Sequence, residues 1–133
     1  MVDAFRMALP SLFAALLVAP GLAAESGPVG KPQQYVYVLQ LTPRMHEANP
    51  WTDTDNGVIR QHFARLAKAA DAGQVILAGR TTERLDRTFG LVIFEAESEE
   101  AARLFMESDP AVAANIMSAT LHPYSVALYR KTR

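Results

Sequence analysis

The sequence predicts an α+β fold in which one antiparallel β-sheet carries its helices on one face. Runs rich in β-branched and aromatic residues alternate with segments whose apolar residues recur every three or four positions, in the order strand, helix, strand, strand, helix, strand. A length of 133 residues, with 50% hydrophobic and 20% charged residues, fits one ordinary globular domain. This element order is that of the split βαβ, or ferredoxin-like, arrangement.

The first 24 residues differ in character from the rest of the chain. Arg6 is followed by an uncharged apolar run over residues 7 to 24 that ends in small residues. This layout predicts a signal peptide over residues 1 to 24, with an uncleaved membrane anchor as the alternative, since roughly 20 apolar residues span a bilayer. Pro10 and Pro20 favour cleavage. We therefore expect a periplasmic or secreted protein, or a membrane-anchored one if the leader is kept.

Residues 25 to 33 hold two Gly and two Pro and predict a flexible leader in front of a domain that spans residues 34 to 130. The first strand is expected over residues 34 to 41, where β-branched and aromatic residues dominate. The polar segment that follows, residues 42 to 57, contains the only tryptophan and is long for a connection. Such loops are usually functional or disordered.

The first helix is expected from Val58 to Ala72 and is ended by Gly73. Strands over residues 74 to 79 and 88 to 96 follow it, joined by a charged connection. The apolar residues of the helix recur at the spacing of an amphipathic helix. They are Ile59, Phe63, Leu66, Ala67 and Ala70.

The second helix is expected to start at Ser98, which is a good N-cap residue, and to stop at Asp109 because the residue before a proline disfavours helical geometry. Glu99 and Glu100 in its first turn suit the helix dipole. A short helical turn over residues 111 to 117 and a last strand over residues 120 to 129 complete the order.

Both faces of the expected sheet are apolar. In the first strand, Tyr35, Tyr37, Leu39 and Leu41 alternate with Val36 and Val38, and in the third strand Leu91 and Ile93 alternate with Val92 and Phe94. A sheet with water on one side alternates more cleanly, and a soluble monomer rarely exposes so large an apolar face. We therefore predict a sheet-to-sheet homodimer that buries about 1,200 Å² or more.

Composition excludes several classes of function. The formal net charge is −1 and the longest basic run is the terminal "RKTR", so the chain lacks the charge distribution of nucleic-acid binding. The absence of cysteine excludes disulfides, thiolate metal sites and a cysteine nucleophile. His46, His62 and His122 do not have metal-ligand spacing, so we expect no metal and no cofactor. No nucleophile-elbow, P-loop or Rossmann glycine pattern is present.

His62 and Asp109 are the candidate catalytic residues. His62 lies three residues after Ile59 and four before Leu66, on or beside the apolar side of the first helix. By spacing alone, His62 is better described as a core histidine than as a functional residue, and Asp109 as ordinary turn chemistry before Pro110. In the expected fold, both side chains can point into one pocket, where a carboxylate would orient the imidazole for acid–base work.

Four further residues are candidates for binding a substrate. Arg80 and Thr81 begin the connection after the second strand, and the forked donors of an arginine suit a carboxylate or phenolate. Trp51 in the long loop is placed to cover a ring, and His122 lies on the last strand. The alternatives are a solvated arginine at a strand end, a tryptophan that caps the core, and a histidine that belongs to the sheet.

Three stretches, "RQHFARLAKAADAGQVILAGRT", "TFGLVIFEAESEEAARLFMESDPAV" and "LHPYSVAL", together resemble the YCII-related domain family over about residues 34 to 130. The resemblance implies a ferredoxin-like domain of the dimeric α/β-barrel superfamily and a pocket around a His-Asp pair, which here would be His62 and Asp109. The chain departs from the family pattern at Asn115, where relatives tend to carry glycine, and in its signal-like leader.

These observations favour a small dimeric enzyme that needs no cofactor, a lyase or isomerase in which His62 and Asp109 transfer a proton on a small cyclic or phenolic substrate. One alternative is a non-catalytic module of the cell envelope that binds a small ligand in the same pocket. Another is a purely structural dimer.

Overall fold

The computed structural model describes residues 31–84 and 86–131. The signal peptide expected over residues 1 to 24 therefore lies outside the described residues, as does most of the expected leader. The last residue of the expected leader, Gln33, belongs to the first strand. No helix within the described part of the chain has both the length and the apolarity needed to cross a membrane.

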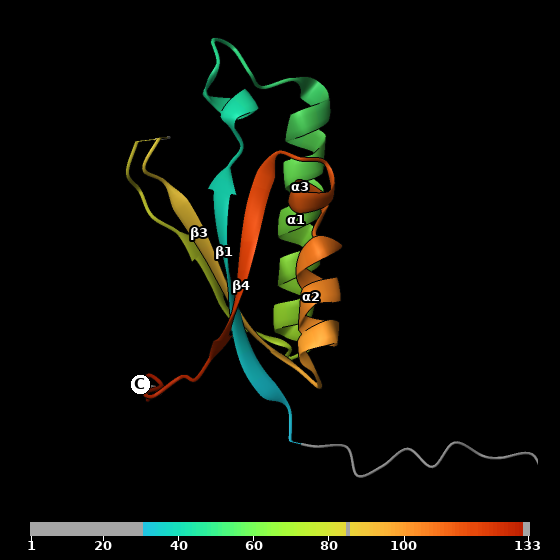
Figure 1. The fold of residues 1–133 in the computed structure, drawn as a ribbon, viewed down its shortest axis with the longest axis vertical. Helices are drawn as coiled ribbons and strands as arrows, with labels where there is room; N and C mark the ends of the chain where they lie inside the picture. Colours follow the sequence, from blue (N-terminus) through green and yellow to red (C-terminus); the bar gives the residue numbers. More distant parts are fainter. Residues whose placement is uncertain (1–30, 85, 132–133) are drawn as a thin grey trace, which may run out of the picture.

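Four strands form one antiparallel sheet whose order is β2-β3-β1-β4. Figure 1 shows the helices packed together on one side of this sheet, which confirms the predicted ferredoxin-like α+β fold. A homodimer is not part of this single-chain structure. The elements in chain order are β1 (Gln33–Leu41), the 3-10 helix η1 (Pro43–His46), α1 (Asp53–Asp71), β2 (Val75–Arg80), β3 (Phe89–Ala96), α2 (Glu99–Glu107), α3 (Pro110–Ala113) and β4 (Met117–Tyr124).

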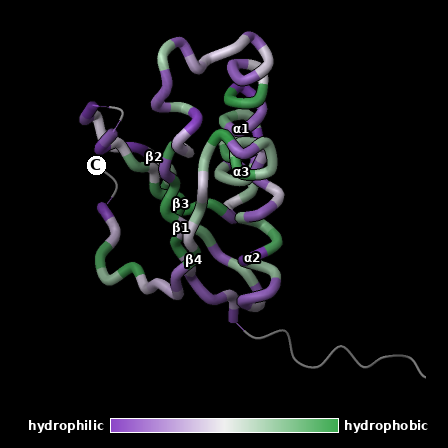
Figure 2. The backbone as a smooth tube through the Cα atoms, turned by 45° about the horizontal axis from the view of Figure 1, so that its top comes forward, coloured by the Kyte–Doolittle hydropathy of each residue, from purple (hydrophilic) through white to green (hydrophobic). Residues whose placement is uncertain are grey.

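The hydrophobic core lies between the central strands and the helices. Tyr37 pairs with Val92 across β1 and β3, and both side chains are fully buried. Phe94 stacks on Phe105 of α2 with a centroid distance of 4.7 Å and meets Tyr37 edge to face at 5.6 Å. Figure 2 shows hydrophobic positions gathered along these central strands. The core therefore supports Tyr37 rigidly beneath the helices.

Helix α1 begins at Asp53, five residues before the expected start at Val58. The cause is a capping box: Thr52 Oγ1 accepts a hydrogen bond from Asp55 N at 3.1 Å, and Asp55 Oδ2 accepts one from Thr52 N at 3.0 Å. Arg44 of η1 adds two hydrogen bonds to the Asp55 carboxylate. The prediction of an irregular segment over residues 42 to 57 is therefore confirmed for residues 47 to 52 and wrong for residues 43–46 and 53–57. Local polar contacts start α1 where apolar periodicity is absent.

The last strand is Met117–Tyr124 instead of residues 120 to 129. Its partner β1 begins at Gln33, and the pairing ends where Tyr124 meets Gln34, so the apolar residues beyond Tyr124 pair with no strand of residues 31–84 and 86–131. The turn before β4 contains Asn115 with φ 55°, a left-handed conformation that asparagine tolerates better than most residues. Asn115 therefore adopts at this turn a backbone conformation that is otherwise typical of glycine.

Candidate functional site

The structure brings His62 of α1 into contact with Asp109, which lies between α2 and α3. His62 Nδ1 is 2.7 Å from Asp109 Oδ1 and 2.9 Å from Oδ2. Both residues are buried, with 4% of His62 and none of Asp109 exposed. The pair is formed because the apolar side of α1 packs against α3, and the polar residue on that side meets the N-cap residue of α3.

Asp109 has two further hydrogen-bond donors besides His62. As the N-cap of α3, its Oδ1 accepts a hydrogen bond from Ala111 N at 3.0 Å. Its Oδ2 accepts one from the Tyr37 hydroxyl at 2.9 Å. Both carboxylate oxygens are therefore held in place, and the carboxylate has no freedom to rotate away from the imidazole.

These contacts fix the charge of the carboxylate. Burial by itself would raise the pKa of Asp109, but the hydrogen bond and charge of His62, the Ala111 N–H and the Tyr37 hydroxyl outweigh it and hold the pKa below its usual range. Burial and the adjacent Asp109 carboxylate raise the pKa of Tyr37 far above its ordinary value. Asp109 is thus an anion and Tyr37 a neutral donor, so the Nδ1 of a neutral His62 carries the proton and Nε2 is the basic nitrogen.

Arg65 stands on the other side of the carboxylate. Its Nη2 donates to the carbonyl of Phe105 at 2.7 Å and to Ser108 Oγ at 3.2 Å, and its guanidinium lies 4.1 Å from the Phe105 ring centroid. Its Nη1 is buried, 4.0 Å from Asp109 Oδ2, and has no hydrogen-bond partner among the described residues. A fixed cation beside the pair further favours the ionised carboxylate.

Sequence reasoning missed both Tyr37 and Arg65 as parts of this site. Tyr37 was assigned only to an apolar face, although a buried tyrosine usually has a partner for its hydroxyl. Arg65 follows His62 by three residues and so lies on the same side of α1, which is the one signal that pointed to it.

His62 also lines a cavity of about 840 Å³ between α1, β2 and β3. Its Nε2 forms no hydrogen bond with any described residue, while Nδ1 on the opposite side of the ring is taken by Asp109. The walls are almost entirely apolar, and the groups able to form hydrogen bonds through their side chains are few. They are His62, Arg80, Thr88 and the indole of Trp51.

Not all of the predicted binding residues lie at this cavity. Trp51 and Arg80 line it. Thr81 closes the β2–β3 hairpin instead: its N–H donates to the carbonyl of Phe89 at 2.9 Å, and its Oγ1 accepts from Phe89 N at 3.2 Å. His122 pairs with Val36, on the sheet face opposite Tyr37 and the helices. The structure therefore gathers His62, Trp51 and Arg80 at one cavity and places Thr81 and His122 outside it.

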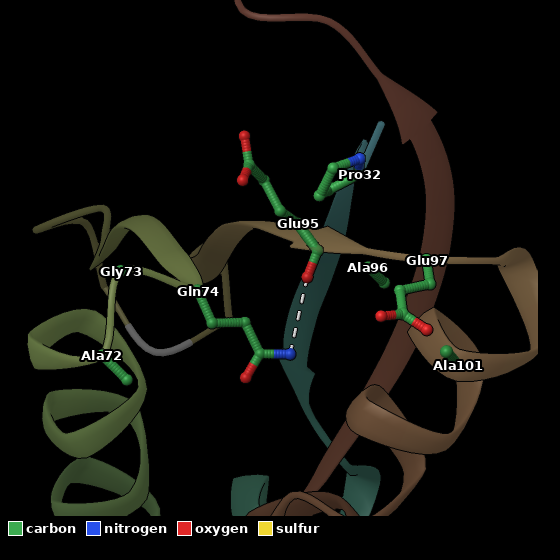
Figure 3. A pocket seen from close by; sticks show the side chains of 8 residues that line it. All are labelled: Pro32, Ala72, Gly73, Gln74, Glu95, Ala96, Glu97 and Ala101. Carbon is green, nitrogen blue, oxygen red and sulfur yellow. Dashed lines mark hydrogen bonds between the residues drawn. The ribbon is translucent and has the colours of Figure 1, made fainter. Parts of the chain in front are cut away.

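A second hollow of about 410 Å³ lies at the other end of α1 and is shown in Figure 3. Its most prominent interaction is the hydrogen bond from Gln74 Nε2 to the carbonyl of Glu95 at 3.5 Å. Neither an imidazole nor a hydroxyl nucleophile lines it. Across the described ranges, no three His, Cys, Asp or Glu side chains come together as a group able to hold a metal ion.

The fold and the buried pair define a ferredoxin-like α+β protein with a histidine and an aspartate at the edge of an apolar cavity. The chain belongs to the YCII-related domain family, whose model matches residues 35–121. A search of curated protein sequences gives no match. Among solved structures, the chain is similar to 5-chloro-2-hydroxyhydroquinone dehydrochlorinase from Burkholderia phenoliruptrix in complex with 2,5-dihydroxybenzoquinone, with 20% identity over 69% of this chain and 93% of that one, and a TM-score of 0.47.

Proposed function

We propose that this protein is an enzyme in which His62, oriented by Asp109, transfers a proton on a small cyclic or phenolic substrate. The reaction class is a lyase or isomerase reaction that calls for no cofactor. The observation that carries the proposal is that Asp109 holds Nδ1 of His62 at 2.7 Å while the same imidazole lines a cavity of about 840 Å³. Such an arrangement leaves one basic nitrogen directed at whatever the cavity binds.

In the proposed reaction, Nε2 of neutral His62 removes a proton from a carbon or hydroxyl group of the bound substrate. The imidazolium that forms is stabilised by the Asp109 carboxylate on Nδ1. The electron pair left on the substrate then either expels a leaving group, which is an elimination, or shifts along a conjugated system and takes the proton back from His62 at another atom, which is an isomerisation.

The apolar walls support a ring-shaped substrate. Aliphatic and aromatic side chains surround the space, and a cavity of this volume accepts a molecule of one or two rings.

The test is a screen of small cyclic ketones, phenols and halogenated phenols with the wild-type protein and with His62→Gln. We expect the variant to lose about 10² to 10⁴ of the rate, the usual contribution of a general acid or base. His46→Gln is the matched control, because His46 is an exposed histidine of η1 that does not line the cavity. Unchanged turnover by a folded His62→Gln protein would contradict the role of His62.

A second candidate is a non-catalytic module of the cell envelope that holds a small ligand in the same cavity. The predominance of apolar groups in the lining favours it, since such walls retain a ring without any proton transfer. A ligand that raises the melting temperature and is recovered unchanged after long incubation supports binding alone. Conversion of that ligand supports the enzyme.

We also propose that the protein forms a sheet-to-sheet homodimer and that its leader directs it to the periplasm or the outside of the cell. Val38, Leu91 and Ile93 are half-buried on the sheet face opposite the helices, and Leu77 on the same face is 54% exposed. A second copy packed on this face would cover them, and light scattering on Leu77→Asp should then report a monomer in place of a dimer. Fractionation of expressing bacterial cells tests whether the leader directs the protein out of the cytoplasm.

A further inference from the structure

Among the described residues that line the His62 cavity, Arg80 is the only one with a permanent charge. No aspartate, glutamate or lysine accompanies it there. The four ion pairs formed by described residues involve Arg44, His62, Arg65 and Arg103, and none involves Arg80. Arg80 therefore brings to the cavity a positive charge that no carboxylate of the described chain neutralises.

The sheet register directs Arg80 to the side of the sheet where the helices lie. Arg80 is the last residue of β2 and pairs with Gly90 of β3, which pairs in turn with Leu39 of β1. Paired residues share a face, and Leu39 belongs to the core beneath the helices. Arg80 and His62 thus reach the cavity from different elements, a strand end and a helix.

Gly90, the residue that pairs with Arg80, allows close packing between β3 and β1. Gly90 has no side chain, and a Cβ placed there would lie 3.3 Å from Leu39 Cβ. A larger residue at position 90 would press on Leu39, so glycine lets β3 lie close against Leu39 of β1 beside Arg80.

A single unpaired cation in an apolar cavity selects for anions. Arg80 is itself exposed to solvent, so water and salt screen its charge, and its attraction for an anion is strongest at low ionic strength. A guanidinium presents a planar fork of donors that matches the oxygens of a carboxylate and also binds a phenolate. A cationic ligand would be repelled, and a neutral ring would gain only from apolar contact.

We propose that Arg80 restricts the His62 cavity to ring-bearing ligands with one compact anionic oxygen group, a carboxylate or a phenolate. The anionic group lies at Arg80 and the ring lies along the apolar wall towards Trp51. The description of this ligand as a substrate rests on the proposed function. Anion binding by Arg80 needs no chemistry at His62.

The experiment is calorimetric titration of the full-length protein with benzoate, 4-nitrophenolate, benzamide and benzylammonium at low salt. We expect at least one of the two anions to bind. Benzamide and benzylammonium should bind at least about tenfold more weakly than that anion. The anion that binds more tightly identifies the oxygen group that Arg80 prefers. Arg80→Gln should lose about tenfold in anion affinity, and Arg80→Lys should recover part of it because the charge remains.

Arg103→Gln is the matched control, since Arg103 is an exposed arginine of α2 that pairs with Glu99. Anion affinity that is equal in Arg80→Gln and wild type, or reduced equally by Arg103→Gln, would overturn the proposal, as would benzamide binding as tightly as benzoate. His62→Gln separates this proposal from the proposed function. If the variant still binds the anion, Arg80 is the anchor whether or not any substrate is turned over.

Discussion

The hydroxyl of Tyr37 donates a hydrogen bond of 2.9 Å to Oδ2 of Asp109, and both groups are fully buried. This bond joins the central strand β1 to the turn between α2 and α3. It makes the sheet part of the support behind His62, because Asp109 in turn holds the imidazole.

Replacing Tyr37 with Phe tests this support. The variant removes the hydroxyl donor from Oδ2 of a buried carboxylate and leaves that oxygen only the contact it shares with His62 Nδ1, so we expect the free energy of unfolding to fall by about 1 to 3 kcal/mol. Urea unfolding at neutral pH measures the change. Tyr35→Phe is the control, since Tyr35 donates only to Gln33 Oε1 in a partly exposed bond, and it should cost less. Equal losses in the two variants would contradict a special role for the bond to Asp109.

The lowered pKa of Asp109 predicts how stability depends on pH. Because the pKa is lower in the folded than in the unfolded protein, the ionised carboxylate stabilises the fold fully above the unfolded value of about 3.9. This stabilisation is lost as the pH falls through the lower, folded value. The stability advantage of the wild type over Asp109→Asn should therefore be largest near neutral pH and shrink below about pH 4. If the stability advantage of the wild type over Asp109→Asn grew as the pH fell, the pKa of Asp109 would be raised in the folded protein and not lowered.

The capping box of α1 predicts a defined loss of stability. Thr52→Ala removes the acceptor for Asp55 N, and we expect a loss of about 1 kcal/mol in thermal or urea unfolding. Ser98→Ala at the start of α2 is a matched variant, because Ser98 Oγ accepts one backbone hydrogen bond but belongs to no reciprocal box. The Thr52 variant should be the more destabilised of the two. The reverse order would show that the reciprocal bond adds nothing.

Trp51 predicts a spectroscopic signal for binding. It is the only tryptophan in the chain, it lines the cavity, and 38% of it is exposed. A ring that enters the cavity should displace water from the indole, so we expect a saturable change in the intensity and wavelength of its fluorescence. The titration gives an affinity that should agree with calorimetry. A bound ligand that leaves the fluorescence unaltered would place that ligand away from Trp51.

The element order and the strand faces could be predicted from local sequence patterns. Alternation in β1 placed Tyr35 and Tyr37 on one side and Val36 and Val38 on the other, as the cross-strand register shows. The start of α1 could not be found in the same way, because its first turns are polar and depend on contacts among Arg44, Thr52 and Asp55. Apolar periodicity carries no information about such a helix start.

The candidate site was predictable only in part. His62 and Asp109 were paired through the expected fold and the family resemblance, and the structure brings them within 2.7 Å. Tyr37 and Arg65 reach Asp109 from β1 and α1, and contacts between residues so distant in the chain leave no local pattern. The position of His122 depended on the register of β4, which the sequence does not specify without its pairing to β1.

Asp109 also caps α3 by accepting the hydrogen bond from Ala111 N. One carboxylate thus closes a helical turn and orients an imidazole. A substitution at this position would lower the amount of folded protein in the cell as well as any activity, because a loss of even 1 to 2 kcal/mol of stability changes abundance several-fold. Selection for stability and selection for activity therefore both act against substitutions at position 109. A directed-evolution library that is selected only for soluble expression should already be enriched in aspartate at this position.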